Sequence, residues 1–123
     1  MNKRKRNVYM FNLSTLQDLS EDLMDYDIYE TFGEKLDNFD FIKVLIKASI
    51  STRNEQEAHL KAVMFLSQYI DKSEHDHCRE MINEIMQLRD YEYLIDVIRN
   101  TVGVQSAKYP SVDIKGERLV VKV

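Results

Sequence analysis

Cysteine, proline and glycine are scarce in this chain of 123 residues, and each shortage excludes a class of structure. The single cysteine, Cys78, cannot form an intrachain disulfide, which fits a reducing compartment. Three glycines are too few for loops that cradle phosphate through backbone N–H groups, and no phosphate-loop, dinucleotide-binding or nucleophile-elbow motif occurs in the sequence. We therefore expect no catalytic residues, no cofactor and no enzymatic activity.

Long apolar runs are missing as well. No stretch approaches the roughly 18 apolar residues that a membrane span requires, and the basic N-terminal segment lacks the apolar run of a signal peptide. The content of 44% hydrophobic and 31% charged residues is typical of globular proteins, and the length suits one domain spanning residues 1–123. We expect a soluble cytoplasmic protein with no membrane partner.

Charge is unevenly distributed along the chain. Acidic residues outnumber basic ones by 21 to 17, but four of the basic residues lie in Lys3–Arg6, so the rest of the chain has a net charge of −8. An acidic body argues against a nucleic-acid-binding face on the folded core. Residues 1–6 are expected to form a flexible basic arm, and nucleic acid is an unlikely partner.

Apolar periodicity and capping residues predict five helices. Ser14 with Gln17 and Thr52 with Glu55 have the spacing of capping boxes, and Gly33 and Gly103 are suited to end helices. The predicted helices cover residues 14–25, 37–51, 52–71, 73–88 and 90–102, and residues 28–32 add one more helical turn.

The helix predicted over residues 52–71 has the most apolar surface. Leu60, Val63 and Met64 share one face, and Phe65 and Leu66 extend the apolar surface beyond that stripe. A helix that is apolar on several sides is normally buried, so this helix is expected at the centre of the domain with Leu60 and Met64 in the core.

Both ends of the chain favour strands. Residues 111–123 alternate between apolar and polar on either side of Lys115-Gly116, which predicts a β-hairpin, and residues 7–13 are rich in strand-forming side chains. Because an isolated hairpin is marginally stable, residues 7–13 can add a third strand. The predicted fold is mainly α (α+β), a five-helix bundle-like domain with a small terminal hairpin or three-stranded sheet.

One short segment, Glu74–Cys78, concentrates side chains that can bind metal ions. Residues two apart on a helix point about 200° away from each other, so His75 and His77 cannot face the same ion. A zinc site needs three or four converging ligands. We therefore expect no metal site.

A second segment concentrates carboxylates: Asp18, Glu21, Asp22, Asp25, Asp27 and Glu30. Their spacing distributes them around a helix, which favours a solvated surface over a catalytic pair. The same surface charge could instead mimic a nucleic-acid backbone.

Aromatic residues spaced two apart are the candidate protein-binding residues. The members of each pair, Phe39 with Phe41 and Tyr91 with Tyr93, point to different sides of a predicted helix, so one core cannot readily bury both. Tyr26 and Tyr29 flank the acidic segment and are also candidates for exposure. Exposed aromatic patches commonly mark protein–protein sites, and six methionines supply adaptable apolar surface.

Over its full length the chain resembles, in size, acidity and helical plan, the tail assembly chaperones of long, non-contractile-tailed phages of low-GC Gram-positive hosts. Lys, Ile, Asn, Asp and Tyr are plentiful while Ala, Gly and Pro are scarce, as in non-virion (non-structural) phage proteins of such hosts. The resemblance implies a self-associating homo-oligomer in the host cytoplasm that shields an amphipathic or hydrophobic helical client, the tape measure protein. One alternative is a small phage or plasmid regulator that inhibits a host protein, with acidic mimicry of nucleic acid as one means. A third possibility is a nucleic-acid-binding factor that uses the basic arm of residues 1–6.

Overall fold

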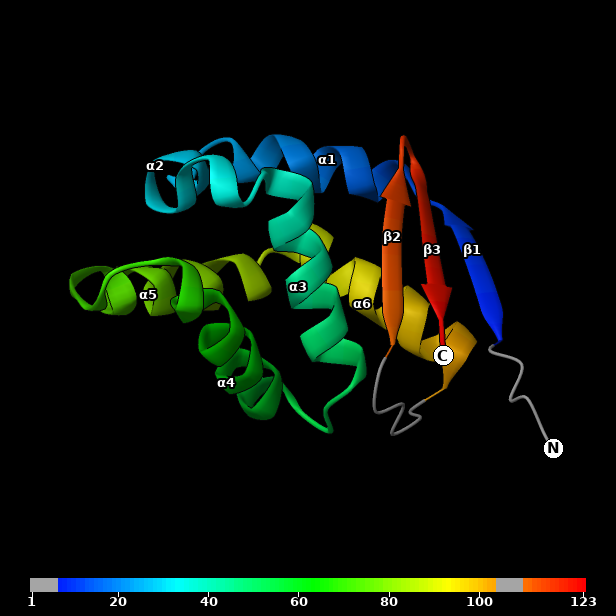
Figure 1. Ribbon diagram of the computed structural model, residues 1–123. Helices are drawn as coiled ribbons and strands as arrows, with labels where there is room; N and C mark the ends of the chain where they lie inside the picture. Colours follow the sequence, from blue (N-terminus) through cyan, green and yellow to red (C-terminus); the bar gives the residue numbers. More distant parts are fainter. Residues whose placement is uncertain (1–6, 104–109) are drawn as a thin grey trace, which may run out of the picture.

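The computed structural model describes residues 7–103 and 110–123, and these residues form a mainly helical α+β fold, as the sequence predicts (Figure 1). The basic arm predicted for residues 1–6 lies outside the described residues. The α-helices and strands in chain order are β1 (Val8–Asn12), α1 (Ser14–Leu23), α2 (Ile28–Phe32), α3 (Asn38–Ile50), α4 (Glu55–Leu66), α5 (His75–Met86), α6 (Arg89–Val102), β2 (Ser111–Lys115) and β3 (Arg118–Lys122). Short 3₁₀ helices cover Gly33–Lys35, Ser67–Tyr69 and Lys72–Glu74. None of the helices in the described ranges is long and apolar enough to cross a membrane.

The two ends of the chain form one antiparallel sheet of order β1-β3-β2. The hairpin turns at Gly116, whose φ of 62° is readily adopted by glycine, and Phe11 lies opposite Leu119 across β1 and β3. The predicted third strand is thus confirmed. The inner face of the sheet supplies Phe11, Val112, Leu119 and Val121 to the core, while the other face carries Val8, Met10 and three basic side chains.

Helix α3 is the central helix of the fold. It contacts β2, α4 and α6, and its buried residues include Phe41, Ile42, Leu45 and Ser49, which lie on more than one side of the helix. The expectation that the 52–71 segment would be central is therefore wrong, and that segment is also shorter, since its α-helix ends at Leu66.

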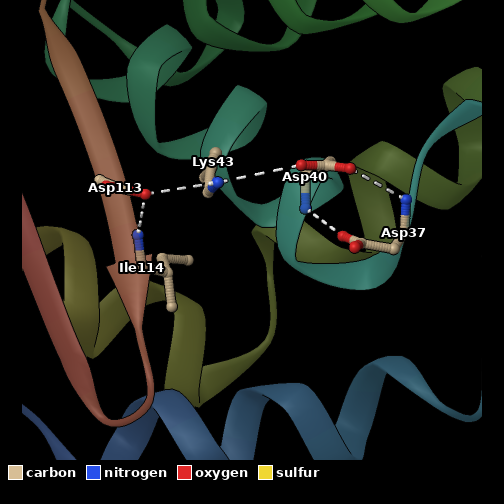
Figure 2. A network of polar contacts seen from close by, with 5 residues as sticks. All are labelled: Asp37, Asp40, Lys43, Asp113 and Ile114. Atoms are coloured by element: carbon tan, nitrogen blue, oxygen red, sulfur yellow. Dashed lines mark hydrogen bonds and ion pairs between the residues drawn. The ribbon is translucent and has the colours of Figure 1, made fainter.

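The start of α3 is fixed by polar contacts that also reach the sheet (Figure 2). Asp37 is the N-cap and accepts a hydrogen bond from the backbone N–H of Asp40 at 2.7 Å, and Asp40 accepts one from the backbone N–H of Asp37 at 3.3 Å. One turn later, Lys43 Nζ lies 3.6 Å from Asp113 on β2 and 3.9 Å from Asp40. This capping box and ion pair set the entry of α3 beside β2.

Two predicted caps are wrong. Asn54, not Thr52, caps α4 by accepting a hydrogen bond from the backbone N–H of Glu57, while the Thr52 hydroxyl donates to the carbonyl of Ala48 at the end of α3. Ser14 is already inside α1, and the N-cap position is Leu13, without a side-chain cap. Thr52 thus bonds to the end of α3 instead of the start of α4, and Ser14 does not cap α1.

Helix α4 buries a different face from the one predicted. Its buried residues are Ala58, Ala62, Val63 and Leu66, whereas Leu60 and Met64 are 61% and 74% exposed. Small alanine side chains let α4 approach its neighbours α3 and α5 closely, because the distance between packed helices depends on the side chains at their contact. The two large side chains are therefore directed away from the core.

Two leucines of α4 test this assignment. We expect Leu66→Ala to lower the free energy of unfolding by about 2–5 kcal/mol, because it removes buried methyl groups and leaves a cavity. Leu60→Ala should change it by less than about 0.5 kcal/mol, since the side chain is already exposed. Urea unfolding of both variants measures the difference, and equal losses would show that both faces of α4 are packed.

Candidate protein-binding surface

Each predicted aromatic pair has one buried and one exposed member. Phe41 and Tyr91 are buried in the core, while Phe39 and Tyr93 are 41% and 54% exposed. The pairs divide because residues two apart on a helix point in nearly opposite directions. Phe39 on α3 and Tyr93 on α6 are thus the members of these pairs that are available for contact with a partner.

Tyr91 is held by a buried polar network that joins α3 to α6. Its hydroxyl donates to the Leu45 carbonyl at 2.9 Å, so the Ser49 hydroxyl, which also contacts it, is the donor of that second bond. Arg99 donates to the Ser49 carbonyl at 2.7 Å. Burial raises the pKa of Tyr91, and the phenol remains protonated. Tyr91, one of the predicted protein-binding residues, is therefore part of the core and is not available to a partner.

The two tyrosines beside the acidic segment also differ. Tyr29 on α2 is exposed, whereas Tyr26 packs partly against the core. Partial burial raises the pKa of Tyr26, and the nearby carboxylates of Glu84, Asp22 and Asp25 raise it further. The chain thus brings α5 close to the end of α1 at this point.

Three exposed apolar side chains that the sequence pattern did not indicate lie together on α4. Leu60 and Met64 are one turn apart, and Phe65 beside them is also exposed, with its ring 5.9 Å from that of Tyr69. We call Leu60, Met64 and Phe65 the outer face of α4. Ala58 and Ala62, one turn apart, were the sequence feature that indicates the buried face of α4. Small side chains at this spacing let another helix pack closely against that face.

A groove borders this outer face. It has a volume of about 380 Å³ and is lined by Glu55, Gln56, His59 and Leu60 of α4 and by Asn83 of α5. His59 Nε2 lies 3.1 Å from the carbonyl oxygen of Arg79, which joins α4 to α5. The exposed apolar side chains of α4 thus lie next to a groove between α4 and α5.

The residues of the metal-capable segment do not converge. Cys78 is buried, and burial raises the pKa of its thiol to about 11, while His77 lies 4.0 Å from Asp27 on the surface. Within residues 7–103 and 110–123, no group of three or more His, Cys, Asp and Glu side chains is placed to hold a metal ion.

The acidic segment meets a carboxylate from another helix. Asp22 near the end of α1 lies beside Asp90 at the start of α6. Because the protonated carboxyl of Asp22 can donate a hydrogen bond to Asp90, this neighbour raises the pKa of Asp22, and partial burial and the charges of Asp90, Asp18 and Asp25 raise it further. The acidic residues therefore gather from two helices into a region of like charge.

A small cavity lies beside the polar network of α3 and α6. It encloses about 90 Å³ and is lined in part by Ser49, Tyr91 and Arg99. Small-molecule sites typically occupy roughly 300–1,000 Å³, so this cavity is suited to water and not to a substrate.

No protein-family model, curated protein or solved structure matches the chain.

The buried tyrosine network can be tested with two phenol deletions. We expect Tyr91→Phe to lower the free energy of unfolding by about 1–3 kcal/mol, because the buried Ser49 hydroxyl and Leu45 carbonyl each lose a partner. Tyr93→Phe, the matched change on an exposed ring, should stay within about 0.5 kcal/mol of the parent. Chemical denaturation compares them; indistinguishable values would contradict the network.

The contact between Asp22 and Asp90 predicts a pH-dependent stability. A carboxyl whose pKa is raised in the folded state contributes stability below its unfolded pKa of about 4 and loses it as pH rises through the folded pKa. Asp22→Asn should therefore raise the melting temperature at neutral pH, and this gain should vanish in acid. Glu117→Gln, in the exposed β2–β3 turn, is the control; a neutral or negative effect of Asp22→Asn at neutral pH would refute the assignment.

Proposed function

We propose that this chain is a non-enzymatic protein-binding protein whose α4 receives an apolar helical segment of a partner. The observation that carries the proposal is the orientation of α4, which buries Ala58 and Ala62 and exposes Leu60 and Met64. Exposed large apolar side chains that adjoin one another commonly mark protein–protein sites. Burial of Leu60 and Met64 would contribute favourable free energy, and because both lie on the surface, only a partner can bury them.

A helix is the partner shape that suits this surface best. Leu60 and Met64 are spaced i, i+4 and so form a short ridge along α4, beside the groove between α4 and α5. An amphipathic helix lies in such a groove with its own residues at i, i+3, i+4 and i+7. The methionine supplies a flexible side chain that adapts to different apolar contacts.

The strength of a single contact would be modest. Full burial of a Leu or Met side chain stabilises by roughly 1.5–3 kcal/mol, and association costs at least about 4 kcal/mol of lost translational and rotational freedom. A few apolar side chains of one copy thus bind weakly. Several copies bound along one long client would bind far more tightly, because later contacts form at a high effective concentration.

These properties favour the role that the resemblance implies, that of a tail assembly chaperone that self-associates and shields a tape measure protein. Such a protein needs an apolar surface for a helix, an acidic exterior that remains solvated, and repeated copies along a long client. The chain has a net charge of −4 and exposes apolar side chains on α4.

A second function is favoured by the acidic region around Asp22 and Asp90. Carboxylates held close together at an energetic cost are a feature of surfaces that imitate a polyanion. On this reading the chain would be a regulator that inhibits a nucleic-acid-binding host protein. The two functions use different surfaces, and this makes them separable by mutation.

The proposed function is tested with a fluorescent synthetic amphipathic helix that has leucines at i, i+3, i+4 and i+7. We expect the double variant Leu60→Ser, Met64→Ser to bind it at least about tenfold more weakly than the parent, because losing about 1.4 kcal/mol of apolar contact has that effect. Fluorescence anisotropy at about 0.1 M and about 1 M salt should give similar affinities for the parent, since apolar contacts are not screened.

Met24→Ser is the matched control, because Met24 is equally exposed but follows α1. It should bind the helix as the parent does. Unchanged binding by the α4 double variant would overturn the proposal. Loss of binding to a host nucleic-acid-binding protein after reversal of Asp25 and Glu30, with α4 variants unaffected, would favour the inhibitor.

A further inference from the structure

Charge is unevenly distributed over the molecule. Residues 22–34, from the end of α1 through α2, contain five acidic residues and no basic residue. The outer face of the sheet carries the opposite sign, with exposed Lys115, Arg118 and Lys122, while its one carboxylate, Asp113, lies 3.6 Å from Lys43 and 4.0 Å from Lys115. Helix α2 lies at the end of the molecule remote from the three strands (Figure 1).

Elements distant in sequence converge at the acidic end. Asp27 lies 4.0 Å from His77 at the start of α5, and Asp22 contacts Asp90 at the start of α6. Met24 and Tyr29, two of the most exposed apolar side chains among the described residues, belong to this acidic segment. We call this surface, comprising Met24, Asp25, Asp27, Tyr29 and Glu30, the acidic end.

The outer face of the sheet has a matching arrangement of the opposite charge. Met10 on β1 lies opposite Val120 on β3 in the middle of this face, and Val8 lies opposite Lys122 at its end. Asp113 on β2 continues the middle row beyond Val120. Asn12 lies opposite Arg118, and Lys115 lies opposite Arg118 on the other side. We call this surface, comprising Val8, Met10, Arg118, Val120 and Lys122, the sheet face.

We propose that the sheet face of one copy docks on the acidic end of a second copy of this chain. Both surfaces have apolar side chains beside charges of one sign, and the two signs are opposite, so the contact is complementary in both respects. This inference rests on the self-association in the proposed function and names the surfaces that would form it.

The contact between the sheet face and the acidic end is head to tail. When successive copies form the same contact, they build an open row. The two surfaces are different and lie at opposite ends of the molecule, so each copy that docks leaves one of each surface free (Figure 1). A stable interface buries about 800 Å² per partner, roughly a tenth of the 8256 Å² surface of this chain. Such a row would present one α4 per copy along a long helical client.

Sedimentation velocity of the full chain over a range of protein concentrations tests the proposal. At about 0.01 M salt, where charges act over roughly 30 Å, we expect a concentration-dependent series of species extending beyond the dimer. At about 1 M salt, where they act over roughly 3 Å, the series should shift towards the monomer. A monomer at every concentration in low salt would overturn the proposal.

Two charge-reversed variants make the test specific. The sheet variant carries Arg118→Glu and Lys122→Glu, and the acidic-end variant carries Asp25→Lys and Glu30→Lys; all four side chains are exposed, so circular dichroism should be unchanged. Each variant alone should be monomeric at low salt, because both of its surfaces then have the same sign. An equimolar mixture should associate again, since each surface of one variant meets its opposite on the other.

Other occupants of the sheet face give different results. Association that is lost in the sheet variant but kept in the acidic-end variant would mean that sheets pair with sheets, and would overturn the proposal. Binding of a duplex oligonucleotide by the parent but not by the sheet variant, without rescue in the mixture, would assign the face to nucleic acid and also overturn it. Amphipathic-helix binding by the monomeric variants at parent affinity would leave the α4 function standing whichever result is obtained.

Discussion

The position of α3 is the constraint on which the rest of the structure depends. This helix has buried residues on several sides, so β2, α4 and α6 must each cover part of it. The one buried polar side chain among the described residues, Ser49, belongs to α3 and is satisfied through Tyr91 of α6. Helix α4 packs on α3 through the face that contains Ala58 and Ala62. Because Leu60 and Met64 lie on the opposite face, they are exposed to solvent. The candidate binding surface therefore follows from how the core is closed.

Local geometry could be predicted from the sequence wherever it depends only on neighbouring residues. The aromatic pairs divide between core and surface because of helical spacing alone, and the alternation in residues 111–123 was sufficient for the hairpin. The third strand followed from the need of a hairpin for a further partner, which β1 supplies.

Apolar periodicity alone could not decide which face of α4 is buried, because the helix has two apolar faces. One combines Leu60 and Met64, the other Ala58, Ala62, Val63 and Leu66, and Val63 has a helical spacing that suits either face. Which face is buried depends on the distance at which α4 approaches its neighbours, and that distance is set by contacts remote in sequence. The meeting of Asp22 with Asp90 is likewise a tertiary contact that no local pattern encodes.

The two surfaces proposed for binding depend on different forces. The outer face of α4 is apolar, so its contacts are little affected by salt, whereas docking between the sheet face and the acidic end relies on charge and weakens with screening. Separation of the two allows copies to associate without covering α4. A row of copies would then bind one helical client through many weak contacts.

Oxidation of methionines, followed by mass spectrometry, tests the central claim about α4 most directly. Among the described residues, Met10, Met24 and Met64 are exposed while Met81 and Met86 are buried, so the chain contains its own controls. At about 1 M salt, where the copies should be separate, we expect a bound amphipathic helix to protect Met64 while Met24 remains reactive and Met81 is unreactive throughout. Protection of Met24 with Met64 still fully reactive would contradict the account, because the client would then lie on the acidic end and not on α4.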